Sequence, residues 1–255
     1  MSPVTTRHAP PAREEVPASA RLRARLAPAE PVLRQAAAGL WRPEGLLPRY
    51  VGYLCAMHGV IRASVPLLRL AAERSRELAL RGDPLGGRLA AHLERHAREE
   101  ENHDVWLLDD LAAAGADPDA ALRAVPPPDV AALAGAQYYW VAHHHPVALL
   151  GYVSVLEGHA PEPGLAPYLA GLTGLPDAAF RTVRAHSRLD TGHVADVYAL
   201  LDSLPMTRAH ETAVTVSALH TLDALTRLFV RLGRCAPAAV PGRESGPSAP
   251  TRGVP

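Results

Sequence analysis

The sequence predicts an all-α protein, a bundle of seven to eight helices packed in one domain. Apolar residues recur at helical spacing through most of the chain. Strand patterns, meaning β-branched alternation between paired turn residues, are lacking. Prolines and glycines lie in short groups that separate the helical stretches, and 255 residues suffice for one sizeable core.

The two ends of the chain differ in composition from the middle. Residues 1–22 are rich in proline and have no helical pattern, which predicts a flexible tail. Residues 236–255 are rich in glycine, proline and serine, which predicts a disordered tail. Residues 23–235 are therefore expected to form a single helical domain.

The first three helices are delimited by residues that stop them. The first is expected over about 26–41. The second spans about 48–81, and Pro66 should kink it because proline lacks a backbone donor. The third spans about 85–114 and is closed by Gly115.

The remaining helices follow a break at three consecutive prolines, residues 126–128. Pro176 and Asp177 suit the start of a long helix, because proline is accepted in the first turn and a carboxylate interacts favourably with the helix dipole there. Thr207 is expected to cap the last helix. The expected helices cover about 129–143, 146–158, 165–172, 177–203 and 208–233.

Charge and cysteine content argue against several classes of function. The formal net charge is zero, so no nucleic-acid partner is expected. No apolar run predicts a membrane span, so no membrane partner is expected either. Cys55 and Cys235 are too few for a disulfide framework, and no secretory signal precedes the domain, which favours a cytoplasmic protein.

The most specific candidate site is formed by His186, Asp190 and His193. Offsets of four and seven residues bring side chains back to nearly the same angle on a helix. Two imidazoles and a carboxylate would then share one helix face. This mixture of nitrogen and oxygen donors suits a transition metal.

Three further donors complete the candidate site. Glu100 and His103 form a Glu-x-x-His pair on the third helix, the spacing used in carboxylate-bridged di-iron bundles. Glu157 is the only charged residue in the apolar stretch 147–158, where an unpaired carboxylate costs free energy. Three carboxylates and three imidazoles would hold two irons and leave positions open, whereas zinc more often takes three or four ligands.

Other histidines receive less specific interpretations. His96 lies seven residues before His103 on the same face, and we favour a role as hydrogen-bond donor to a ligand over a ligand or no role. The run at residues 143–145 is expected to be a helix junction, because Pro146 follows it directly.

Residues 99–111, 145–158 and 186–193, in this order, resemble those of the haem-oxygenase-like di-iron oxidases and oxygenases, often called iron-containing redox enzymes. The likeness covers about residues 45–205. It implies a compact seven-helix fold shared with haem oxygenase and thiaminase-like proteins. It also implies two Fe ions, activated by O2 in the Fe(II) state, with no haem.

The resemblance carries the six donors over as iron ligands, residue by residue. Some members place the first carboxylate further from its histidine, so Glu99 and Glu73 stay open as alternatives to the first ligand. The six expected metal ligands are Glu100, His103, Glu157, His186, Asp190 and His193.

The expected function is that of an O2-dependent oxidase or oxygenase acting on a small amine, amino acid or fatty acid, of a kind found in natural-product biosynthesis. A separate electron donor and a homodimer are left open. Two alternatives remain: a metal-free thiaminase-like or cofactor-independent oxidase of the same fold, and a non-enzymatic iron-binding helical module. The apolar helix faces place the substrate among Tyr53, Met57, Trp106 and Tyr152.

Overall fold

The computed structural model describes residues 16–234. The tail expected over 236–255 lies outside these residues, as do residues 1–15 of the expected N-terminal tail. The expectation for residues 18–22 is wrong, because they belong to helix α1, Ala18–Leu26. Leu22 and Leu26 are buried in the core, so their apolar surface holds this helix against the bundle.

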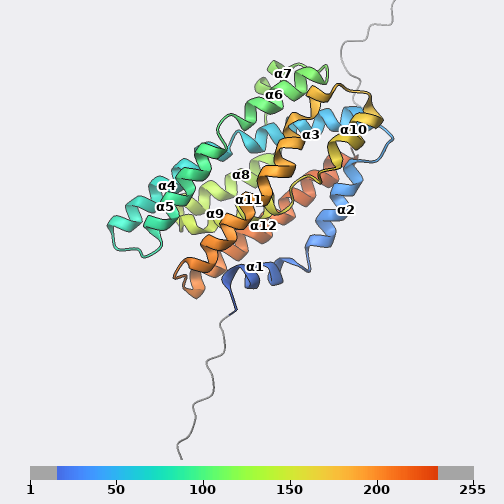
Figure 1. Cartoon of the computed structure of the whole chain (residues 1–255). Helices are drawn as coiled ribbons and strands as arrows, with labels where there is room; N and C mark the ends of the chain where they lie inside the picture. Colours follow the sequence, from blue (N-terminus) through green and yellow to red (C-terminus); the bar gives the residue numbers. More distant parts are fainter. Residues whose placement is uncertain (1–15, 235–255) are drawn as a thin grey trace, which may run out of the picture.

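Between residues 16 and 234 the chain is helical and contains no strand, which confirms the predicted class. The helices lie side by side in an elongated bundle (Figure 1), in which α9 packs against both α11 and α12. Two short 3-10 turns, Pro146–Ala148 and Asp177–Phe180, lead into α9 and α11. The further α-helices are α2 Glu30–Leu40, α3 Leu46–Ile61, α4 Ser64–Leu80, α5 Gly86–Glu99, α6 His103–Ala113, α7 Pro118–Arg123, α8 Pro128–His143, α9 Leu149–Gly158, α10 Leu165–Thr173, α11 Arg181–Ser203 and α12 Arg208–Arg234.

The second and third expected helices are each broken in two, at residues 62–63 and 100–102, whereas the first corresponds to α2 and begins at Glu30 instead of about residue 26. Pro66 does not kink a continuous helix as expected. It lies in the first turn of α4, where a backbone N–H would have no acceptor within the helix, so proline costs no hydrogen bond there. The short α7 was not expected; the Asp117 side chain caps it by accepting the N–H of Asp119 at 2.9 Å.

Helix α12 packs against α9, α2 and α8 and lies at the centre of the core. Its contact with α9 is close, because a Cβ added at Gly151 would lie 2.8 Å from the backbone nitrogen of Ala218 and closer still to the carbonyl oxygen of Val214. Only glycine permits this approach. The contact fixes the position of α9 and therefore of Glu157 near its C-terminal end.

Asp110 joins α6 to the start of α11. Its carboxylate is fully buried and accepts the backbone N–H groups of Arg181 at 3.1 Å and Thr182 at 2.9 Å. The first N–H groups of a helix have no partner inside that helix, so this carboxylate satisfies two of them. Burial raises the pKa of Asp110, although the hydrogen bonds from Thr182 and Arg181 oppose that rise.

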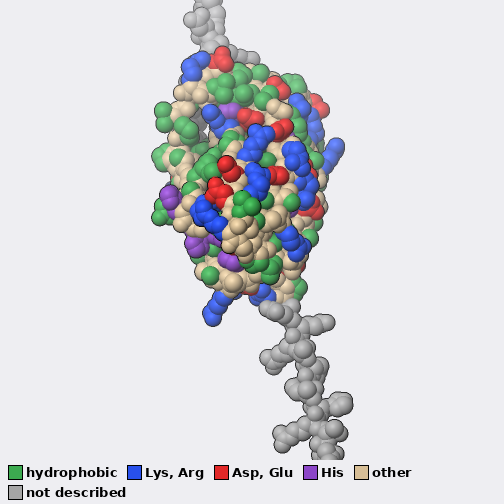
Figure 2. Space-filling view, turned by 90° about the vertical axis from the view of Figure 1, so that its left-hand side faces the viewer, with side chains coloured by type: hydrophobic (Ala, Val, Ile, Leu, Met, Phe, Trp, Pro, Cys, Tyr) green, Lys and Arg blue, Asp and Glu red, His purple; other side chains and the backbone are tan. Residues whose placement is uncertain are grey.

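The surface carries charges of both signs. On the face shown in Figure 2, Arg and Asp or Glu side chains are interspersed. The segment Leu46–Leu80 and helix α12 are long and apolar enough to cross a membrane by length and composition, contrary to the expectation from the sequence. Core helices of soluble proteins pass the same test, and parts of both segments are buried inside this bundle.

Candidate metal centre

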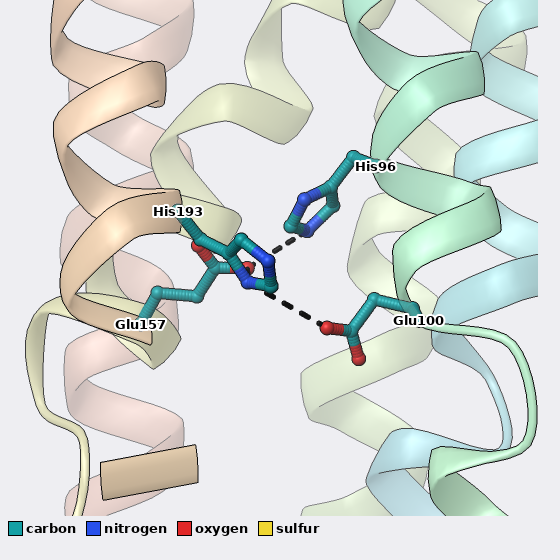
Figure 3. A group of neighbouring side chains, drawn as sticks. All are labelled: His96, Glu100, Glu157 and His193. Atoms are coloured by element: carbon teal, nitrogen blue, oxygen red, sulfur yellow. Dashed lines mark ion pairs between the residues drawn. The ribbon is translucent and has the colours of Figure 1, made fainter. Parts of the chain in front are cut away.

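Four helical segments bring the six expected donors into one region of the bundle. Glu100 follows α5, His103 begins α6, and Glu157 lies near the end of α9. His186, Asp190 and His193 lie on α11. Figure 3 shows side chains from α5, α9 and α11 directed toward one another. Donor atoms of His96, Glu100, Glu157 and His193 all lie within 4.8 Å of one another.

Glu100 and His103 do not share one continuous helix, which corrects the expectation from their spacing. Glu100 is the C-cap of α5, and the chain turns at Asn102, whose φ is 68°. Asparagine tolerates this left-handed conformation better than most residues. The turn still brings His103 Nδ1 within 3.0 Å of Glu100 Oε2, to which it donates.

Glu157 pairs with His96, which the sequence predicted as a hydrogen-bond donor to a ligand without showing which one. Its Oε1 lies 2.7 Å from His96 Nε2, and both side chains are almost fully buried. Burial raises the pKa of Glu157, although His96 opposes the rise. Burial alone would lower the pKa of His96, but the hydrogen bond and charge of Glu157 raise it. The short contact and burial make this a strong hydrogen bond between the two side chains.

The three donors of α11 face the same region, as the offsets of four and seven residues predict. His186 Nδ1 donates to Asp190 Oδ1 at 3.0 Å. His193 Nδ1 lies 3.7 Å from both Glu100 Oε1 and Glu157 Oε1. Burial opposes protonation of His186, but Asp190 and Glu100 raise its pKa.

The donors form two halves on either side of Glu100. The His103 half holds His103, His186 and Asp190, and the rings of its two histidines are 5.1 Å apart. The His193 half holds His193 and Glu157. One oxygen of Glu100 faces each half, because Oε2 contacts His103 and Oε1 faces His193. A carboxylate in this position can bridge two metal ions.

The chemistry of the donor set fits iron. Glu157 Oε2, His186 Nε2 and His193 Nδ1 are buried, and none has a hydrogen-bond partner among residues 16–234. Buried polar atoms are normally satisfied, so three such atoms together indicate a missing partner. The imidazoles and carboxylates supply the mixture of nitrogen and oxygen ligands that iron accepts in proteins.

The alternative first ligands lie outside the inner group. Glu73 is exposed on α4 and is not among the grouped donors. Glu99 has a half-exposed side chain, and its Oε2 is 3.7 Å from His96 Nδ1 and 3.7 Å from His193 Nε2, on the outer side of both rings. The geometry therefore favours Glu100 as the inner carboxylate.

A cavity of about 550 Å³ adjoins the centre. His186, Asp190, Glu100 and Glu157 contribute to its wall. Of the residues expected beside a substrate, Tyr53, Met57 and Tyr152 line this cavity. Trp106 does not line it; its ring packs 4.0 Å from that of His103.

Two polar atoms in the cavity wall have no partner among residues 16–234. They are the hydroxyl groups of Tyr152 and Thr182, both buried. Sequence reasoning missed Thr182, because a lone threonine in the first turn of a helix carries no pattern of its own. A substrate with a hydrogen-bonding group would satisfy both hydroxyls.

A second group of potential ligands, Asp83, His145 and His210, lies elsewhere in the bundle. The expected junction at 143–145 is confirmed, since α8 ends at His143 and His145 caps the next turn by accepting the N–H of Val147 at 3.0 Å. His210 Nδ1 likewise accepts the N–H of Thr207, whose hydroxyl caps α12 as predicted. Both Nδ1 atoms are acceptors, so both Nε2 atoms carry hydrogen and are unsuited to a metal.

Comparison with known proteins agrees with this geometry. Residues 94–226 match the profile of the iron-containing redox enzymes, a span that includes all six expected ligands. The chain belongs to this family. No curated protein matches the sequence. The matched span also contains the buried donor atoms without a hydrogen-bond partner, on Glu157, His186 and His193.

Solved structures show how widely this fold is shared. A domain of unknown function with a haem oxygenase-like fold from Shewanella denitrificans OS217 is 20% identical, with a TM-score of 0.63 over 84% of this chain and 88% of that one. A TenA homologue from Pseudomonas syringae pv. tomato DC3000 is 13% identical, with a TM-score of 0.63 over 90% and 98%. The predicted haem-oxygenase-like fold is therefore confirmed.

Proposed function

We propose that this member of the iron-containing redox enzymes is an O2-dependent di-iron oxidase or oxygenase of a small organic molecule. One observation carries the proposal: six nitrogen- and oxygen-bearing side chains from four helical segments meet beside a cavity of about 550 Å³. Three of their donor atoms are buried and unpartnered within residues 16–234.

The proposed iron ligands divide between the two halves of the centre. His103, His186 and Asp190 would hold one iron, Glu157 and His193 the other, and Glu100 would lie between them. Iron in the Fe(II) state would supply electrons to O2. Burial alone would raise the pKa of Glu100, but the hydrogen bond from His103 and the charges of the neighbouring histidines hold it below the usual value, which favours the ionised form that binds a cation.

The cavity would bind and orient the substrate. Its walls include apolar side chains such as Met57 and Leu107, which exclude water from the reacting region. The hydroxyls of Tyr152 and Thr182 would hydrogen-bond to a polar group of the substrate and set its orientation. A small amphipathic molecule fits this arrangement better than a highly charged one.

The test combines metal analysis with oxygen consumption. We expect anaerobic addition of Fe(II) to load two irons per chain, and admission of air to give a transient long-wavelength absorption band with a suitable substrate. His186→Ala and Asp190→Ala should both abolish substrate-dependent O2 uptake. Sub-stoichiometric iron, with no band for any amine, amino acid or fatty acid tried, would refute the proposal.

Two rival functions give different results in the same assays. A metal-free enzyme, suggested by the similarity to the TenA homologue, would turn over its substrate in the presence of a chelator, and the His186 and Asp190 variants would stay active. A non-enzymatic iron-binding module would bind metal and consume no O2 with any substrate.

A further inference from the structure

His96 occupies the same kind of position as the expected ligand His193. Its Nε2 points to Glu157 Oε1 at 2.7 Å, and its side chain is only 5% exposed. Its ring is 4.9 Å from that of His193, at nearly a right angle. Both rings approach the same oxygen of Glu157, since His193 Nδ1 lies 3.7 Å from Oε1 (Figure 3). His96 therefore lies within the group of donors and not behind it.

The two halves of the centre are unequal without His96. The His103 half has three donor side chains besides the shared Glu100, namely His103, His186 and Asp190. The His193 half has only His193 and Glu157 besides Glu100. His96 adds a third donor to the His193 half and makes the two halves equal in number.

The outer nitrogens of the two rings face the same carboxylate. Glu99 Oε2 lies 3.7 Å from His96 Nδ1 and 3.7 Å from His193 Nε2. A histidine that binds a metal through one ring nitrogen almost always donates its other N–H to a carboxylate, a carbonyl or water. Glu99 is placed to accept from both rings once their inner nitrogens are bound to a metal.

We propose that His96 is a seventh metal ligand, through Nε2, and that Glu99 orients His96 and His193 from outside. The inference rests on the proposed function, because it assumes that metal binds at this centre. In the structure the same Nε2 atom donates to Glu157, one of the proposed ligands. Metal binding replaces that hydrogen bond with a bond to the ion.

The competing role is the one expected from the sequence, in which His96 only donates a hydrogen bond to Glu157. His96→Gln separates the two, since the glutamine amide can still donate to a carboxylate but cannot replace imidazole as a strong ligand. His92→Gln is the matched control. His92 is buried on the same helix one turn earlier, with its ring parallel to that of His96 and 6.1 Å away.

The experiment measures Fe(II) content and affinity in the full chain, with circular dichroism to confirm folding. We expect wild type and His92→Gln to bind two irons, and His96→Gln to bind one iron with unchanged affinity and the second at least about 100-fold more weakly. Glu99→Gln removes a half-exposed charge and should fold; it should weaken the same iron by roughly 10–100-fold, as is usual for outer partners.

The outcomes are distinguishable. Wild-type iron binding by both His96→Gln and Glu99→Gln would overturn this inference and leave the proposed function standing. Failure of the wild-type protein to bind iron would overturn both. If His96→Gln does not fold, Glu99→Gln decides, because unchanged affinity for both irons in that variant contradicts the proposed arrangement.

Discussion

Gly151→Ala adds one methyl group at the contact of α9 with α12. The new carbon would lie 2.8 Å from Ala218 N, 3.1 Å from Ser217 Cβ and closer still to the carbonyl oxygen of Val214. Two of these atoms belong to the main chain of α12 and cannot rotate away. Overpacking in a core usually costs about 1–3 kcal/mol, and we expect a destabilisation of about 3 kcal/mol here.

Gly135→Ala is the matched control. Gly135 lies in the interior of α8, and no atom lies within 4 Å of a Cβ added there. Alanine should stabilise this helix by up to about 1 kcal/mol, through higher helix propensity and lower entropy of the unfolded chain. The same chemical change thus gives opposite signs at two helical glycines.

Urea unfolding followed by circular dichroism measures both effects as shifts of midpoint at constant slope. Iron binding provides a second readout, because an α9 displaced from α12 carries Glu157 with it, and Gly151→Ala should bind iron more weakly than Gly135→Ala. A Gly151→Ala protein as stable as Gly135→Ala would show that the helices are further apart than described, and would refute the reasoning.

Three further predictions concern the buried polar groups and the metal. Asp110→Ala leaves two N–H groups of α11 unpaired and should cost roughly 2–6 kcal/mol in urea unfolding, with Asp110→Asn less harmful because it keeps one acceptor. Burial lowers the pKa of His145 despite Asp83, so the contribution of this histidine to stability should be complete above about pH 6.5 and be lost as the pH falls below it. His145→Asn should reduce the loss of stability on acidification, and equal slopes for both proteins would contradict this prediction. Fe(II) at 100 times its Kd should stabilise the wild type by about 2.7 kcal/mol. The measurement is a rise in Tm that EDTA reverses. No change in Tm would argue against metal binding by the folded protein.

Helices with a clear stop signal were predictable from the sequence. Those over 129–143, 165–172 and 208–233 agree with α8, α10 and α12 to within one residue. The breaks inside the second and third expected helices were not predictable, because residues 62–63 and 100–102 have no proline or glycine and Asn102 is the only residue there that suggests a turn. There, tertiary packing overrides local propensity.

The expected site residues came together, but their arrangement required the structure. The offsets on α11 predict one shared face, since helical geometry alone determines it. Spacing cannot show that His96 reaches Glu157, because the two residues are 61 positions apart and lie on different helices. The role of Glu99 is likewise visible only where α5 meets α11.

The turn at Asn102 has a consequence for how the centre accommodates ions of different size. His186 and His193 are seven positions apart on the single helix α11, so their backbones are about 10 Å apart along the helix axis. By contrast, Glu100 ends α5 and His103 begins α6, and these two helices are joined by a turn at Asn102, whose backbone is left-handed. We expect swapping Fe(II) for a smaller or larger cation to be absorbed by pivoting at residues 100–102, while α11 keeps its length.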